Sequence, residues 1–252
     1  IAPIWYIIKI SIAWVLSVDE IWIIYWVLSL ITLVSSFNDL WMTESLNKFI
    51  PDYASKQKYS KVKTVLAYAF FTQVITWSII FLIFYFWSGF LSNVYFKNPE
   101  SLWVVKIFAF YFLWISIFQV LNTFFRAIQN TFLHKLTEFT RMLFVLIWTI
   151  FLFSTNTWNI INYSLTWVFW VYVWIIFCTI MFYIKYYRVY FKWLEYEFSK
   201  NLFKKIFKYA LLIFISSQAS TILSQMDMQM IIYFLWNTYA WYYTTYLSLV
   251  TI

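Results

Sequence analysis

Residues 160–184 read IINYSLTWVFWVYVWIIFCTIMFYI, an apolar run without a charged side chain. As an α-helix, with a rise of about 1.5 Å per residue, this run is long enough to cross the roughly 30 Å hydrocarbon core of a bilayer. Its apolar residues are continuous rather than alternating, which favours a helix over a strand of a membrane barrel. The stretch therefore predicts a membrane-spanning helix.

The composition of the whole chain extends this prediction. The 252 residues are 64% hydrophobic and 11% charged, with a mean hydropathy of +0.73. Soluble domains carry about 25% charged residues, and a soluble protein of this size cannot hide so much apolar surface. Disorder is excluded because disordered chains are poor in apolar residues. We therefore expect an all-α, polytopic membrane helix bundle.

The apolar runs predict eight spans, of which the last is incomplete. They are Ala2–Leu16, Ile21–Leu40, Thr64–Phe86, Leu102–Phe125, Arg141–Phe153 with an amphipathic extension back to Leu133, Ile160–Ile184, Tyr209–Leu235, and a run beginning near Trp241. Between the second and third, Asn47–Lys63 is predicted to be a helix end followed by a polar connector. Both chain ends fall inside apolar runs, so we expect a fragment of a longer protein.

The basic residues predict the orientation of the bundle. Fifteen of the 18 lysines and arginines follow the second, fourth and sixth spans: Lys48, Lys56, Lys58, Lys61, Lys63, Arg126, Lys135, Arg141, Lys185, Arg188, Lys192, Lys200, Lys204, Lys205 and Lys208. Because cytoplasmic loops are enriched in Lys and Arg, these loops are predicted to be cytoplasmic. The same asymmetry accounts for the net charge of +8 without a nucleic-acid partner. Lipid binding by the loop Lys185–Lys208 is a further possibility.

A weak internal repeat links the two ends of the chain. At an offset of 219 residues, Leu16 matches Leu235, Trp22 matches Trp241, and 28–30 matches 247–249 as Leu-Ser-Leu. Six spans separate the two copies, and an even number of spans preserves orientation. We therefore expect two parallel pseudo-repeat halves, with residues 1–208 forming the first bundle and 209–252 beginning the second. Transporters are often built from such repeats, with the substrate site between them.

Several motifs carry a resemblance to a known family. Residues 48–53 read KFIPDY, residues 125–129 read FRAIQ, and residues 223–227 read LSQMD within the seventh span. Together with the repeated junctions, these resemble the polysaccharide (O-antigen type) flippases of the multidrug, oligosaccharidyl-lipid and polysaccharide exporter superfamily. The resemblance implies 12–14 spans, of which seven to eight are present here. It also implies alternating access without covalent chemistry or a cofactor.

The function implied by the resemblance is movement of a lipid-linked oligosaccharide or polysaccharide precursor across the bacterial inner membrane, coupled to H⁺ or Na⁺. A multidrug or lipid II exporter of the same superfamily is an alternative. A membrane glycosyltransferase using the acidic pair Asp19 and Glu20 is another, although negative charge is also favourable at a helix N-terminus. His134 is the only histidine and lies in a predicted basic loop, so neither a Ser-His-Asp triad nor a histidine-based metal site is expected.

Two charged residues inside predicted spans are candidate site residues, because charge within a membrane is costly. Lys9 and Asp227 both lie roughly 10–12 Å from the same end of their spans if these are helices. We predict that Lys9 attracts a diphosphate or an acidic sugar, and that Asp227 binds the coupling ion. The alternatives are a structural ion pair or an Asp227 that stays protonated.

Further polar residues extend this candidate site. Ser217, Thr221, Ser224 and Asp227 are spaced to share one helix face, flanked by Gln218 and Gln225. They either bind sugar hydroxyls or join helices. Arg126 is predicted to meet a phosphate entering from the cytoplasm or to anchor the topology. Asp39 and Glu44 are predicted to pair with either Lys48 or Arg126. Gln73, Gln119 and Asn122 are further candidates.

The glycine and tryptophan counts suggest a hypothesis about the codons. The chain has one glycine and 17 tryptophans, whereas average usage of about 7% predicts roughly 18 glycines. By the resemblance, Trp22, Trp41, Trp236 and Trp241 stand where glycine is expected. The pair at 170 and 174 would form a small-xxx-small packing motif if it were glycine. We hypothesise that many of these tryptophans are UGA codons read as glycine; the alternative is an interfacial aromatic belt.

Overall fold

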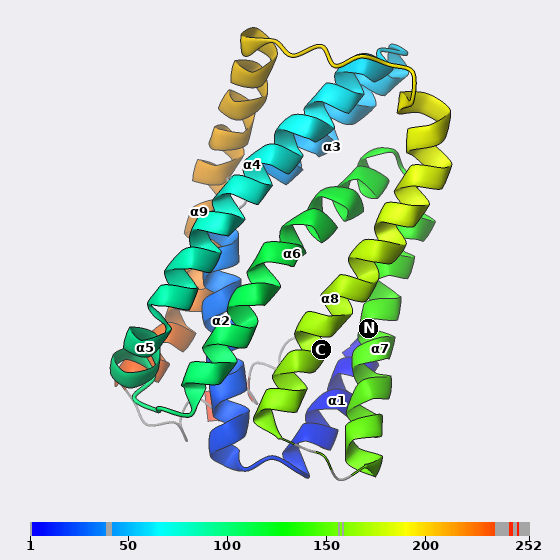
Figure 1. The fold of residues 1–252 in the computed structure, drawn as a ribbon. Helices are drawn as coiled ribbons and strands as arrows, with labels where there is room; N and C mark the ends of the chain where they lie inside the picture. Colours follow the sequence, from blue (N-terminus) through cyan, green and yellow to red (C-terminus); the bar gives the residue numbers. More distant parts are fainter. Residues whose placement is uncertain are drawn as a thin grey trace.

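The computed structural model describes residues 2–38, 42–155, 157, 159–234, 242–243 and 246 (Figure 1). All regular secondary structure in these residues is helical, which confirms the predicted all-α class. Several helical side chains lie outside the description, including those of Lys9, Trp22 and residues 217–225. Trp41, Trp236 and Trp241 also lie outside the described residues.

The helices follow the predicted spans closely. They are α1 (Ala2–Ala13), α2 (Val18–Asn38), α3 (Met42–Ser55), α4 (Tyr59–Phe86), the short α5 (Ser88–Phe90) with the π-helix η1 (Leu91–Tyr95), α6 (Ser101–Ala127), α7 (Thr131–Ser154), α8 (Ile160–Phe182) continuing as the π-helix η2 (Tyr183–Phe191), and α9 (Lys200–Phe234). Each of the first seven predicted spans corresponds to one long helix. The eighth lies mostly outside the described residues.

Two boundaries differ from the prediction. The predicted connector after the second span contains a complete helix, α3, because Met42, Leu46, Phe49 and Tyr53 line one buried face. The helix α9 begins at Lys200 rather than Tyr209, so the predicted division at 208/209 falls inside a helix. Both differences arise where charged residues interrupt the apolar run without interrupting the helix.

Three helical stretches among the described residues are long and apolar enough to cross a membrane: Tyr59–Phe86, Thr131–Ser154 and Ile160–Phe191. A shorter apolar stretch covers Ser101–Tyr111 of α6. An apolar stripe on α4 is exposed, formed by Phe71, Ile75, Ile79, Leu82 and Phe86. Large exposed apolar surfaces of this kind mark contact with lipid or another protein. The helices therefore indicate a membrane protein; the total number of spans and the repeat stay predictions.

The long helices are arranged around α6, which packs against α4 on one side and α8 on the other. The helix α9 lies along α2 and α3, and α1 lies beside α7 (Figure 1). The α3–α4 turn, the α6–α7 turn and the linker 192–199 between η2 and α9 all lie at the top of Figure 1. We call this end the basic end. The structure thus gathers the three basic segments of the sequence at one end of the bundle.

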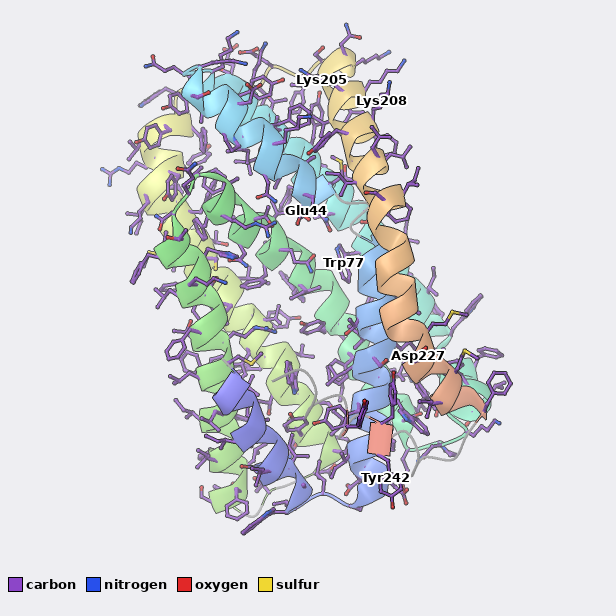
Figure 2. The ribbon with its side chains drawn as sticks, turned by 180° about the vertical axis from the view of Figure 1, so that it is seen from behind. Glu44, Trp77, Lys205, Lys208, Asp227 and Tyr242 are labelled. Carbon is purple, nitrogen blue, oxygen red and sulfur yellow. The ribbon has the colours of Figure 1, made fainter. Side chains whose placement is uncertain are left out.

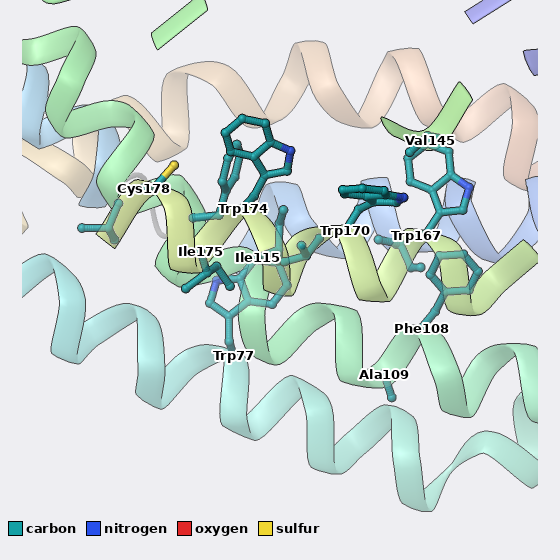
Figure 3. Packing of buried hydrophobic residues seen from close by; sticks show 14 of the residues in the cluster. Trp77, Phe108, Ala109, Ile115, Val145, Trp167, Trp170, Trp174, Ile175 and Cys178 are labelled. Carbon is teal, nitrogen blue, oxygen red and sulfur yellow. The ribbon is translucent and has the colours of Figure 1, made fainter. Parts of the chain in front are cut away.

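Buried tryptophans occupy the middle of the bundle (Figure 3). The indole N–H of Trp77 donates a hydrogen bond to the side-chain oxygen of Gln73. The indole nitrogens of Trp170 and Trp174 are buried and have no hydrogen-bond partner among the described residues. Leaving such a donor unsatisfied costs about 1–3 kcal/mol. The ring of Trp170 also stacks on Phe144 at a centroid distance of only 3.7 Å. The indole donors at 170 and 174 are therefore buried without a partner among the described residues, whereas that of Trp77 is paired. The codon hypothesis stays a prediction.

Candidate functional site

A polar contact joins α3 to the basic end of α6. The Nη2 of Arg126 lies 2.8 Å from Oε1 of Glu44, and its Nε donates to Oδ1 of Asn47 at 3.2 Å. The amide of Asn47 in turn donates to Glu44 Oε2 at 2.7 Å. The predicted partnership between Glu44 and Arg126 is confirmed, while Asp39 lies outside the described residues. One carboxylate and one amide thus fix the direction of the guanidinium.

Asn122, one helical turn before Arg126, joins α6 to α7. Its Oδ1 accepts a hydrogen bond from the hydroxyl of Thr137 at 2.8 Å and lies 2.9 Å from Nδ1 of His134. The side chain of Asn130 accepts the N–H of Leu133 and caps α7, so the helix begins at Thr131 and places His134 in its first turn. His134 is therefore a helical residue, not the loop residue that the sequence predicted.

Arg141 lies deeper in α7 than the sequence suggested. The apolar part of the predicted fifth span began at Arg141, with an amphipathic extension back to Leu133. The helix α7 begins at Thr131, which places Arg141 about 15 Å along it. Its side chain lies beside the phenol of Tyr111 of α6 and interacts with it electrostatically. The Nε of Arg141 is buried and has no hydrogen-bond partner among the described residues. A cation inside a helix of membrane-spanning length marks a candidate functional site.

These contacts form three groups of polar side chains on α3, α6 and α7, which together we call the polar track. It comprises Glu44 and Asn47 of α3, Tyr111, Asn122 and Arg126 of α6, and His134, Thr137 and Arg141 of α7. The track contains two guanidinium groups and one carboxylate, so it carries net positive charge. The sequence singled out Arg126 and Asn122 as candidate site residues but missed Arg141 and Tyr111. The amphipathic pattern from Leu133 was the signal that placed Arg141 within a helix.

Asp227 has a partner that the sequence did not predict. The hydroxyl of Tyr243, in the predicted eighth span, donates to Oδ2 of Asp227 at 3.1 Å. Figure 2 shows Asp227 in the half of the bundle away from Lys205 and Lys208, with Glu44 between these positions. The candidate ion-coupling residue and the polar track therefore occupy different halves of the bundle.

The other predicted residues of this region are placed only by their backbones. The helix α9 is continuous through Ser217, Gln218, Thr221, Ser224 and Gln225, so the predicted shared face follows from its periodicity. Their side chains, and that of Lys9 on α1, lie outside the described residues. Their roles stay predictions, as does pairing of Lys9 with Asp227.

The acidic pair Asp19–Glu20 lies in the first turn of α2. Both the backbone N–H and the hydroxyl of Ser17 donate to Glu20 Oε2 at 2.9 Å. The N–H of Glu20 donates back to the hydroxyl of Ser17 at 3.3 Å. This is a reciprocal capping box, which satisfies donors at a helix start. The geometry favours a structural role for Glu20.

A pocket of about 680 Å³ opens at the basic end. The α3–α4 turn, the α6–α7 turn and η2 surround it, and Tyr59, Tyr186, Tyr190 and Asn130 contribute to its lining. The rings of Tyr59 and Tyr190 stack at 5.2 Å, and the amide of Asn130 donates to the hydroxyl of Tyr186 at 2.7 Å. None of the polar-track residues lines this pocket.

Comparison of the chain with protein families, with curated proteins and with solved structures found no match. Within the described ranges, no group of three or more His, Cys, Asp or Glu side chains is placed to hold a metal ion. The proposed function below therefore rests on the arginines of the polar track and on Asp227.

Proposed function

We propose that the chain is part of a transporter that moves a lipid-linked oligosaccharide or polysaccharide precursor across the bacterial inner membrane by alternating access. The observation that carries this proposal is the polar track, with one guanidinium group at the basic end of α6 and another within α7, a helix of membrane-spanning length. Such a precursor combines an apolar tail, phosphate groups and sugars. The tail can remain in the lipid while the phosphates and sugars pass through a polar path.

The guanidinium groups suit the phosphates of this substrate. Arginine donates two parallel hydrogen bonds to phosphate oxygens, and such contacts strengthen where water is excluded. In the proposed path, phosphate displaces the carboxylate of Glu44 from Arg126 and then meets Arg141. Lys9 and the hydroxyl and amide face of α9 complete the path toward the opposite end.

Asp227 is the proposed coupling residue. The hydroxyl of Tyr243 donates a hydrogen bond to the carboxylate of Asp227. Binding of H⁺ or Na⁺ at Asp227 changes this contact, and because Tyr243 follows α9 in the chain, the change acts on the geometry between the seventh and eighth spans. The membrane lipids and the coupling ion are the other partners, with the basic end proposed to face the cytoplasm.

The alternatives differ in what they require of these residues. A multidrug exporter for cationic compounds requires an acidic path, whereas the described polar track is net positive. A lipid II exporter carries a similar anionic lipid, so only the identity of the glycan on that lipid distinguishes the two transporters. For a glycosyltransferase, Glu20 would have to be free to act, but it caps α2. The transporter of anionic lipid-linked sugars is therefore the better supported function.

Equilibrium binding tests the role of the polar track. We expect the purified full-length protein to bind a lipid-diphosphate oligosaccharide, and the double variant Arg126→Gln/Arg141→Gln to bind it roughly 100-fold more weakly, since each charge-assisted bond contributes about 1.5–3 kcal/mol. Lys135→Gln is the matched control, because Lys135 carries the same charge on α7 but is exposed. Equal affinity for the double variant and the wild type would contradict the proposal.

A further inference from the structure

The linker 192–199 between η2 and α9 is docked onto α4. Lys63 of α4 is 8% exposed, and its Nζ donates to the backbone oxygens of Phe191 at 3.1 Å and Leu194 at 2.7 Å. The same ammonium lies 4.4 Å from the ring centroid of Tyr196. A buried cation is stable only when such acceptors compensate its lost hydration. Lys63 therefore fixes the first half of the linker.

Two neighbouring residues of α4 fix the second half. The hydroxyl of Thr64 accepts the N–H of Glu197 at 2.9 Å. The hydroxyl of Tyr68 accepts the N–H of Ser199 at 2.9 Å and lies 3.2 Å from its carbonyl oxygen. These bonds hold the backbone immediately before α9. The linker is thus held against α4 at the basic end.

The docked linker closes one side of a second pocket, of about 400 Å³, at the basic end. The lining comes from α3, α4, the linker and the first turns of α9: Tyr53, Lys61, Glu197, Phe198, Ser199, Asn201, Leu202 and Lys205. Two ammonium groups thus come from different helices. Each is held over an aromatic ring, Lys61 at 5.9 Å from Tyr53 and Lys205 at 5.6 Å from Phe49. With Glu197 as the single carboxylate, the lining is net positive.

The surface around this pocket combines exposed aromatic rings with further lysines. Trp193 is 86% exposed and Phe198 57% exposed. Lys200, Lys204 and Lys208 on the first turns of α9 are also exposed, and Figure 2 shows Lys205 and Lys208 at this end. Exposed aromatic rings beside lysines are typical of protein surfaces at the headgroup level of an anionic leaflet.

We propose that this pocket binds the headgroup phosphate of an anionic phospholipid from the leaflet at the basic end. The phosphate lies between Lys61 and Lys205, and the hydroxyl of Ser199 and the amide of Asn201 supply further donors. Glu197 accepts a hydrogen bond from a headgroup hydroxyl, so phosphatidylglycerol fits better than a headgroup without one. The site depends on the basic end lying at a membrane surface and does not depend on transport.

Lipid titration followed by native mass spectrometry tests the site directly. We expect the full-length protein to retain phosphatidylglycerol over phosphatidylcholine, and Lys61→Gln/Lys205→Gln to bind phosphatidylglycerol roughly tenfold more weakly. The control Lys56→Gln/Lys58→Gln removes two exposed lysines from the same end, outside the pocket lining, and is expected to retain the lipid. Equal loss in both double variants would mean non-specific attraction by the basic end and would overturn the proposal.

Three further measurements separate the site from its alternatives. Lys63→Met undocks the linker without changing the pocket lysines, and is expected to weaken phosphatidylglycerol binding while circular dichroism stays unchanged; unaltered binding would overturn the role of the linker.

Inorganic phosphate at millimolar concentration is expected to leave lipid retention unchanged, and full displacement would assign the pocket to free phosphate. Preference for phosphatidylethanolamine, abolished by Glu197→Gln, would overturn the anionic assignment.

Discussion

The two halves of the bundle hold their charges in different ways. Near the basic end, Arg126 is paired with Glu44, and Lys63 donates to the backbone carbonyls of η2 and the linker. Near the middle of α7, Arg141 lies beside Tyr111 of α6. In the opposite half, Asp227 accepts one described side-chain hydrogen bond, from Tyr243, which lies on the next predicted span.

This difference bears on how the bundle would move. Near the basic end, Lys48 lies 3.8 Å from the ring centroid of Tyr209, and the docked linker holds the start of α9. The first part of α9 is therefore fixed to α3 and α4, while the contact at Asp227 depends on one phenol.

Charge reversal in the basic half is expected to have the largest effect. Arg141→Glu places a carboxylate beside Tyr111 and repels an entering phosphate, so we expect flipping in proteoliposomes to fall by roughly 100-fold or more. Arg141→Lys keeps the charge but loses the bidentate fork, and is expected to retain an intermediate rate. If Arg141→Glu flips the precursor at the wild-type rate, the polar track has no part in transport.

Neutralising the opposite half is expected to uncouple transport rather than abolish binding. In Asp227→Asn the rate should no longer respond to a H⁺ or Na⁺ gradient, because the site that binds the ion is lost. Tyr243→Phe keeps the carboxylate and removes one hydrogen bond, so we expect a roughly fivefold change. Rates measured with and without each gradient check both variants. A gradient response preserved in Asp227→Asn would assign coupling to another residue.

The tryptophans in the middle of the bundle offer a test of stability. Trp170→Gly and Trp174→Gly each remove a buried, unpaired N–H, whereas Trp77→Gly removes a paired one. Truncating a well-packed Trp lowers the free energy of unfolding by about 3–5 kcal/mol. Where the indole N–H is unpaired, its removal also relieves a penalty of about 1–3 kcal/mol, so the net loss is smaller. Denaturation should therefore show smaller losses at 170 and 174 than at 77. Equal losses at all three positions would contradict the distinction; UGA codons at 170 and 174 would establish glycine there.

The helix caps at the two ends are expected to contribute similar, smaller amounts. Ser17→Ala removes the capping box of α2 and Asn130→Ala removes the cap of α7, each costing about 1 kcal/mol of unfolding free energy. We expect both variants to keep wild-type transport, since neither side chain lies on the proposed path. Denaturant titration measures the first effect and the flipping assay the second. Loss of transport in Ser17→Ala without loss of stability would reopen a functional role for the acidic pair.

The smallest effect concerns pH at the basic end. The hydrogen bond from Lys56 lowers the pKa of the exposed Asp52 carboxyl. A lowered pKa means that this contribution to stability is present at neutral pH and is lost as the pH falls through the folded-state pKa. Carboxyl titration by NMR should show the Asp52 pKa rising in Lys56→Met. An unchanged value would mean that the ion pair does not form in solution.

The sequence predicted the helices well and the site only in part. Long apolar runs locate the helices, but where charged residues extend a helix, as at the start of α9, the boundary was missed by several residues. The charge pattern gave Arg126 as one of two candidate partners of Glu44. Three features depended on tertiary structure. Arg141 belongs to a helix whose amphipathic start conceals it, Tyr243 meets Asp227 from a later span, and Lys63 is buried only because the linker folds over it. None of these contacts leaves a periodic signal in the sequence.

Flipping by the wild-type protein in proteoliposomes tests the central claim most directly. A fluorescent lipid-diphosphate oligosaccharide is placed in both leaflets, and its accessibility to an external glycosidase is followed over time beside a cationic amphiphile. We expect the oligosaccharide to become fully accessible faster than in protein-free vesicles, with no added movement of the cation. Movement of the cation alone would contradict transport of an anionic lipid-linked sugar and would favour the multidrug exporter.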